Sequence, residues 1–273
     1  MDVGFRFRSA LARALKQTRP DIEVDERGYV KRVEDNLLPG IKREDFADDL
    51  DAGAGSELES KFLAAYSSSA LAVNCFGLFR RPGSTFGIGR HGGVRLRGFE
   101  KTFTTGLARA QPPHLDVVAD GPSGLVAIES KCTECMGVKD AKFSGRYATD
   151  ITDVRCRGPW FAEMLRLMAG GSSYRHLDAA QLVKHALGLA YKTEGRPVTL
   201  VYLYLEPING EAEPAIRQHR DELAAFAARV AGGHPTFEAM SYSRLWASWQ
   251  EQGDADLQEH VGNLKARYEV AVT

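Results

Sequence analysis

Two short apolar runs, LDVVAD (115–120) and LVAIESK (125–131), flank the turn sequence GPSG (121–124). Runs of this length, separated by a turn that contains glycine and proline, are typical of an antiparallel β-hairpin. If GPSG is a four-residue loop, Asp120 pairs with Leu125, and counting back along the ladder places Asp116 opposite Glu129. The hairpin is therefore predicted to bring two carboxylates face to face.

Three charged side chains are expected on one face of this hairpin. Directly opposed residues have Cβ atoms about 4.5–5.5 Å apart, so Asp116 and Glu129 would repel each other unless a cation lay between them. Lys131 follows Glu129 by two residues, and side chains alternate along a strand, so it shares their face. The opposite face of the strand carries Val126, Ile128 and Ser130.

This combination suits the hydrolysis of a phosphodiester bond. Mg²⁺ prefers oxygen ligands and usually takes one or two carboxylates together with substrate phosphate and water. An ammonium group nearby can orient a water molecule or stabilise charge on the phosphoryl oxygens. We therefore expect Asp116 and Glu129 to bind Mg²⁺, with Mn²⁺ as a substitute, and Lys131 to act on the water or the phosphate.

The elements around the hairpin indicate an α/β fold, a mixed central sheet flanked by helices. Apolar periodicity predicts strands near 84–89 and 93–99 and a buried strand at 198–207. Helices are predicted near 5–17, 57–73, 158–169, 176–191, 213–231, 241–249 and 254–268. We divide the 273 residues into an N-terminal helical extension (1–55), a core (56–210) and a C-terminal helical part (211–273) packed on the same domain.

Asp116, followed by Glu129-Ser130-Lys131 at the end of the next strand, resembles the PD-(D/E)xK phosphodiesterase motif. Pro112 and Pro113 stand shortly before the Asp, although neither is adjacent to it. The order of elements over residues 56–207 is similar to that of the superfamily's core. The chain also resembles bacterial proteins that are described as restriction endonucleases of this superfamily. The resemblance implies a restriction-endonuclease-like fold, metal-dependent endonuclease activity on DNA, and a restriction or defence role.

Members of that superfamily often have further residues that support the site. An acid on the first core helix is one of them, and Glu59 is our candidate, with Glu57 second. Both acids also favour a helix N-terminus for electrostatic reasons alone. A Gln on the helix after the motif is another, and Gln181 resembles it in position. A solvent-exposed helix face explains Gln181 equally well.

Charge is unevenly distributed although the formal net charge is only −1. Residues 44–60 carry acids and no Lys or Arg, whereas residues 76–110 carry basic side chains and a single acid, Glu100. A basic, glycine-rich stretch could follow a phosphate backbone, and a solvated hairpin balanced by the acidic segment is the alternative. The candidate DNA-binding residues are Arg80, Arg81, Arg90, Arg95, Arg97 and, on a later helix, Lys184.

The amino-acid composition indicates the cellular compartment and the absence of disulfide bonds. The chain has four cysteines, too few for a disulfide scaffold, and Cys132-x-x-Cys135 lacks a second ligand pair at zinc spacing. We expect reduced thiols, a cytoplasmic protein and no membrane contact, since no run approaches the roughly 20 apolar residues of a membrane span. Cutting both DNA strands with one site per chain would favour a homodimer.

Two other functions stay open at this level. One is a catalytically inactive nucleic-acid-binding module with a nuclease-like fold. The other is an α/β protein that binds a small ligand or a partner, which would leave the opposed carboxylates without a purpose.

Overall fold

The computed structural model describes residues 2–52, 60–107, 112–151, 153, 156–171 and 174–273. Strands β3 (His114–Gly121) and β4 (Gly124–Lys131) form the expected hairpin. Asp120 pairs with Leu125 as expected, but Gly121 also pairs with Gly124, so the turn consists of two residues, 122 and 123. Gly124 has φ +136°, and a Cβ there would lie 2.3 Å from the Pro197 carbonyl oxygen, so the turn requires glycine.

Six strands form one mixed sheet in the order β1-β2-β3-β4-β5-β6. The other four strands are β1 (Phe86–Ile88), β2 (His91–Thr102), β5 (Val198–Tyr204) and β6 (Thr236–Ser241). The first three pairs of neighbours are antiparallel, and β4-β5 and β5-β6 are parallel. Parallel neighbours need crossover connections, and helices provide them here. The expected α/β class with a mixed sheet is confirmed.

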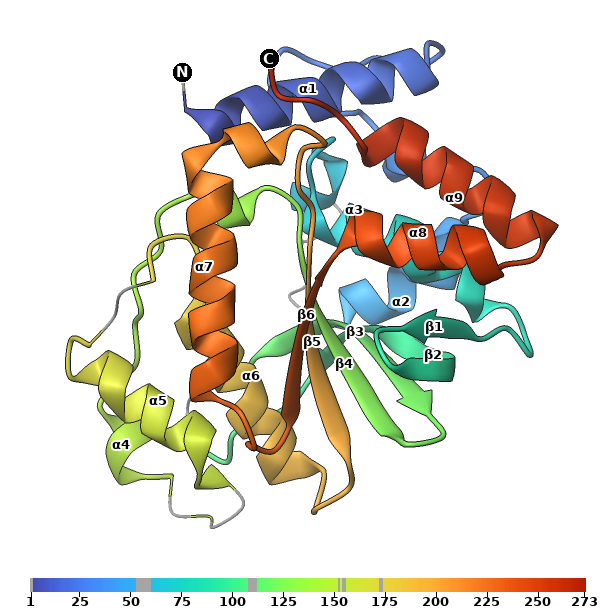
Figure 1. Cartoon of the computed structure of the whole chain (residues 1–273). Coiled ribbons are helices and arrows are strands. Elements are labelled where there is room, and N and C mark those ends of the chain that lie inside the picture. The colour runs from blue at the N-terminus through green and yellow to red at the C-terminus, as the bar shows by residue number, and fades with distance from the viewer. Residues whose placement is uncertain (1, 53–59, 108–111, 152, 154–155, 172–173) are drawn as a thin grey trace.

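Helices cover both faces of the sheet (Figure 1). One face packs against α1 (Val3–Thr18), α3 (Ser68–Phe76), α8 (Tyr242–Gln252) and α9 (Ala255–Tyr268). The other packs against α5 (Pro159–Met168), α6 (Ala179–Lys192) and α7 (Pro214–Arg229). Alternation along β4 separates the two cores, because Val126 and Ile128 enter the first and Leu125 and Ala127 the second.

Shorter helical turns connect these elements. They are α2 (Ala47–Asp51), α4 (Arg146–Thr149), η1 (Val33–Asn36), η2 (Arg43–Asp45), η3 (Lys61–Leu63), η4 (Gly77–Arg80), η5 (Glu134–Met136) and η7 (Gly210–Ala212). Both ends of the chain enter the first core, since Val3 and Val272 are buried in the same cluster. No helix in the described ranges is both long and apolar enough to cross a membrane.

The helix predicted over 57–73 is confirmed from residue 68 onward and is wrong for residues 60–67. Residues 61–63 form the short turn η3, and a new helix, α3, begins at Ser68 with the Ser67 side chain capping the Ala70 N–H. The Asn36 amide donates to the carbonyls of Phe62 and Ala64, so these carbonyls are taken up by tertiary hydrogen bonds. Residues 53–59, with both candidate acids Glu57 and Glu59, lie outside the described residues.

Candidate active site

The charged end of the hairpin gathers the three motif residues on the sheet face that α6 covers. The β3-β4 register runs unbroken from Gly121↔Gly124 to Val117↔Ile128, and continuing it by one step would bring Asp116 opposite Glu129. At this step the Asp116 carboxylate accepts a 2.6 Å hydrogen bond from the Ser130 backbone N–H, which fixes it against β4. Lys131 reaches back along β4 so that its Nζ lies 2.5 Å from Glu129 Oε1.

Glu129 lies between the Lys131 ammonium group and the His185 ring. Its side chain is only 2% exposed, with Lys131 on Oε1 and His185 Nε2 2.9 Å from Oε2. Burial by itself would raise the pKa of Glu129, but Lys131 and His185 together lower that pKa to about 2. Burial opposes the Lys131 charge as well, yet Glu129, Glu134 and Asp116 raise the pKa of the ammonium. Both residues are therefore charged at neutral pH.

The pKa of Asp116 is shifted in the opposite direction to that of Glu129. Burial raises the pKa of its carboxyl well above the ordinary value, and the charges of Glu129 and Glu100 raise it further. Lys131 and the Ser130 N–H counteract this shift only in part. A divalent cation beside Asp116 would remove the conflict, because it would favour the ionised carboxylate.

Glu100 is a residue that the sequence did not identify. Phe99 pairs with Val117 and Lys101 with Leu115, so Glu100 on β2 lies opposite Asp116. Three adjacent strands thus carry a row of carboxylates. Glu100 has φ +48°, a left-handed conformation that is uncommon for residues other than glycine. Its position depends on a register shift between Leu96 and Gly98 in β2, which no sequence pattern predicted.

His185 is the second unforeseen residue. The structure buries it to 1% exposure against Glu129. Its surroundings in α6 gave one signal, because the residues on both sides along LVKHALGLA are mostly apolar. A histidine within such a run needs a polar partner inside the protein.

Contacts at three points place α6, and with it His185. The Asp178 side chain caps the helix by accepting the Gln181 N–H at 3.0 Å. Glu222 on α7 accepts the backbone N–H groups of residues 175, 176 and 177, which fixes the chain just before the helix. At Gly188 the helix approaches the Phe103 backbone so closely that a Cβ would lie 2.3 Å from its carbonyl oxygen.

The other predicted helpers are less clearly placed. Gln181 is half-buried in the first turn of α6, one turn before His185, and the described residues show no contact of its side chain with the motif residues. The Lys184 Nζ lies 5.2 Å from the centroid of the Phe143 ring, and burial lowers the pKa of this lysine. Their roles in the site remain predictions.

The described arginines of the 76–110 stretch are not gathered at the carboxylates. Arg95 pairs with Asp120 across the sheet, four residues and so about 13 Å along β3 from Asp116. Three of the arginines pair with acids: Arg80 with Asp49, Arg90 with Glu238, and Arg97 with Asp120. Arg81 lines a cavity beside α9. DNA binding by this set remains a prediction.

The CxxC cysteines are core residues. Cys132 and Cys135 are free thiols buried in the first core, and burial raises the pKa of both. Among the described residues, no three His, Cys, Asp or Glu side chains are grouped so that they could hold a metal ion. Asp116 and Glu129 therefore offer two carboxylates, which is the number that Mg²⁺ commonly takes when water and substrate phosphate complete its shell.

Comparison with known proteins identifies the family of this chain. Residues 8–269 match the sequence model of a family described as "Restriction Endonuclease associating with ARP". No curated protein and no solved structure matches the chain.

Proposed function

This chain belongs to the family of restriction endonucleases associating with ARP, and we propose that it is a metal-dependent endonuclease that hydrolyses phosphodiester bonds in DNA. The observation that carries the proposal is the gathering of Asp116, Glu129 and Lys131 at the charged end of the β3-β4 hairpin. A restriction or defence role is part of the same proposal, and the family's description supports its restriction part.

The arrangement of elements supports a core of the PD-(D/E)xK type. Helix α3, strands β2, β3 and β4, helix α6 and strand β5 follow one another along the chain, and the four strands are neighbours in the sheet. The two acids stand on β3 and β4, and the lysine ends β4, in the order that the superfamily's motif requires.

The residues divide the work by their chemistry. Asp116 and Glu129 are the oxygen ligands for Mg²⁺, which when bound would polarise the phosphoryl group and acidify a water molecule. Lys131 uses one of its three ammonium donors on Glu129, so the others are available to a phosphoryl oxygen or to the attacking water. The His185 ring lies 2.9 Å from the second Glu129 oxygen and restricts the orientation of the carboxylate.

One observation favours the alternative, a nuclease-like module that binds DNA without cutting it. Both oxygens of Glu129 already have a close neighbour, Lys131 or His185, so the carboxylate could serve in a purely structural ion pair with Lys131. In that case the Lys131–Glu129–His185 group would stabilise the sheet, and removing the lysine would affect folding and leave DNA binding intact.

Nicking of supercoiled plasmid distinguishes the two functions. We expect cleavage in Mg²⁺ that stops in EDTA, and a loss of about 100-fold or more in Lys131→Ala, since transition-state contacts of this kind contribute that much. Lys16→Ala removes the same charge from the exposed last turn of α1 and should cut normally. Metal-independent DNA binding without cleavage in the wild type would favour the binding module.

A further inference from the structure

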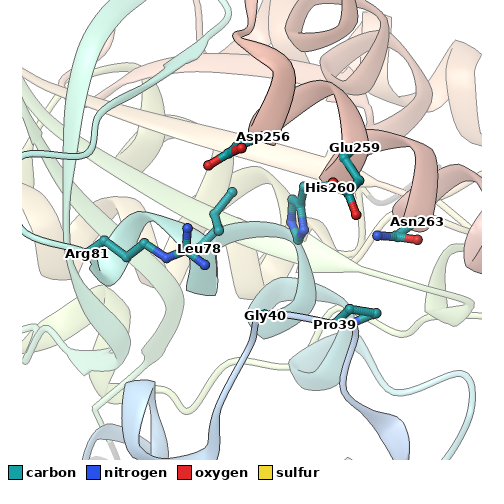
Figure 2. Close-up of a pocket in the computed structure, with 8 residues that line it drawn as sticks. All are labelled: Pro39, Gly40, Leu78, Arg81, Asp256, Glu259, His260 and Asn263. Carbon is teal, nitrogen blue, oxygen red and sulfur yellow. The ribbon is translucent and has the colours of Figure 1, made fainter.

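A groove runs along α9 on the side of the sheet that does not carry Glu129. Its first part is a cavity of about 250 Å³ between the Pro39–Gly40 turn, the end of η4 and α9 (Figure 2). A second cavity of about 470 Å³ shares Leu78, Arg81 and Asp256 with the first and continues along residues 82–85. The shared residues make the two cavities one elongated groove.

One stripe of α9 forms the wall of the first cavity. Asp256, Glu259, His260 and Asn263 recur at helical spacing and face the groove. The adjacent stripe, with Val261 and Leu264, packs into the core. The helix therefore presents a polar face to the groove, and its apolar face is already satisfied.

Several polar groups of this wall form no hydrogen bond or ion pair with the described residues. His260 is only 4% exposed, and its buried Nε2 has no hydrogen-bond partner in the described part of the chain. Figure 2 shows its ring directed from α9 toward the space between Leu78 and Gly40. Arg81, Asp256 and Glu259 line the same cavity, yet none of them forms an ion pair with another described residue. A buried polar atom without a partner is costly, so a ligand that supplies partners would be stabilised here.

The charges define what such a ligand must offer. Asp254, Asp256 and Glu259 give the groove three carboxylates against one guanidinium, Arg81. This excess of negative charge disfavours a nucleic-acid backbone. Arg81 and the Asn263 amide donate hydrogen bonds, as carbonyl oxygens require, while the carboxylates suit cationic side chains.

An extended polypeptide offers both kinds of group at regular intervals, and it matches the elongated form of the groove. We propose that this groove binds an extended, basic segment of a partner protein. Arginine or lysine side chains of the segment contact Asp256 and Glu259, and its backbone carbonyls accept from Arg81 and Asn263. Leu78 and Leu257 provide the apolar contact beneath it.

Fluorescence anisotropy with a fluorescein-labelled octapeptide of alternating arginine and serine tests this proposal on the full-length protein at fixed ionic strength. We expect saturable binding that weakens about tenfold in the double variant Asp256→Asn/Glu259→Gln, as loss of close charge pairs does. Arg81→Ala should also weaken binding. Non-specific attraction predicts the reverse for that variant, because removing a cation makes the groove more negative.

Glu26→Gln is the matched control, since it removes one exposed carboxylate far from the groove in sequence and should leave binding unchanged. The proposal is overturned if the peptide does not saturate, if the double variant binds it as well as wild type, or if Arg81→Ala binds it more tightly. The labelled peptide should be displaced from the protein by an unlabelled copy of itself. If only free arginine or a single-stranded oligonucleotide displaces it, the proposal is also overturned. Plasmid nicking by the same variants reports independently on the proposed nuclease activity.

Discussion

At Asp116 the fold buries a carboxylate between two others, and burial first, then the charges of Glu129 and Glu100, raise the pKa of Asp116. A raised pKa in the folded state means that the neutral form is the one that folding favours. The resulting stability is complete below the unfolded pKa, near 4, and is lost as the pH rises through the folded value. The ionised Asp116 therefore opposes folding at neutral pH when no cation is bound.

Asp116→Asn should for this reason stabilise the metal-free protein at pH 8 by about 1 kcal/mol or more. The amide oxygen can still accept the Ser130 N–H, so the variant removes the charge and keeps the hydrogen bond. Urea unfolding in EDTA measures the effect, and the difference from wild type should shrink at pH 4.5. A variant that is less stable than wild type at pH 8 contradicts the electrostatic account of this residue.

His185 acts through Glu129, which makes it a positioning residue. His185→Ala should reduce nicking by about 10- to 100-fold, as loss of a group that orients a metal ligand does. His185→Gln keeps a donor near Glu129 Oε2 and should recover part of the loss. Kinetics over a range of Mg²⁺ concentrations check this, with the larger change expected in apparent Mg²⁺ affinity. Equal activity in the alanine variant and the wild type would rule out the positioning role.

Local pattern was sufficient for some residues of the site and insufficient for others. Asp116, Glu129 and Lys131 follow from a tight turn and two-residue alternation, which are properties of one short segment. Glu100 and His185 reach the site from β2 and α6 through pairing and packing that involve distant parts of the chain. The position of Glu100 depends on the register shift in β2, and that of His185 on the close packing of α6 against the sheet. The sequence alone specifies neither.

At the scale of elements, α6 is the helix that brings a side chain to the site. Its close approach to Phe103 depends on Gly188, where a methyl group would overlap a backbone carbonyl that cannot move as a flexible side chain can. The distance between α6 and the sheet thus determines whether His185 reaches Glu129.

Gly188→Ala should therefore destabilise the protein by about 1–3 kcal/mol and lower nicking activity. Gly262→Ala is the matched control, because Gly262 lies in α9 with open space around its missing Cβ and alanine there should stabilise by about 0.5–1 kcal/mol. Thermal unfolding and nicking of both variants give the comparison. Similar behaviour of the two glycine variants would show that the approach of α6 is not tight.

Several elements formed close to their predicted positions, and the exceptions have physical causes. Helix α5, strand β5 and helices α7, α8 and α9 follow strong apolar patterns. Strand β6 was missed because its six residues, TFEAMS, lie at the sheet edge and are only partly buried, so they show little alternation. The helix predicted from residue 57 gave way, in the described part, to Asn36 hydrogen bonds from a segment more than 20 residues away.

On the scale of the whole molecule, the sheet curves so that its two edge strands, β1 and β6, come into contact. Arg90 in the β1-β2 turn lies 2.8 Å from Glu238 on β6, and Trp249 of α8 donates to the Gly87 carbonyl. The buried Arg267 of α9 donates to the carbonyls of Leu11 and Ala65. These hydrogen bonds link the C-terminal helix to the N-terminal helix and to the segment just before α3. The sequence predicted the α/β class, but not this closure, because it depends on contacts between residues far apart along the chain.

The whole molecule thus separates a charged site on the α6 side of the sheet from a polar groove on the α9 side. The central claim is that Asp116 and Glu129 form a cation site, and crystals soaked in Mn²⁺ test it most directly. We predict an anomalous difference peak within about 2.2 Å of a carboxylate oxygen of each residue, absent in Asp116→Asn crystals. Well-ordered crystals with no peak between these two side chains, with Glu129 still held by Lys131 and His185, would contradict it.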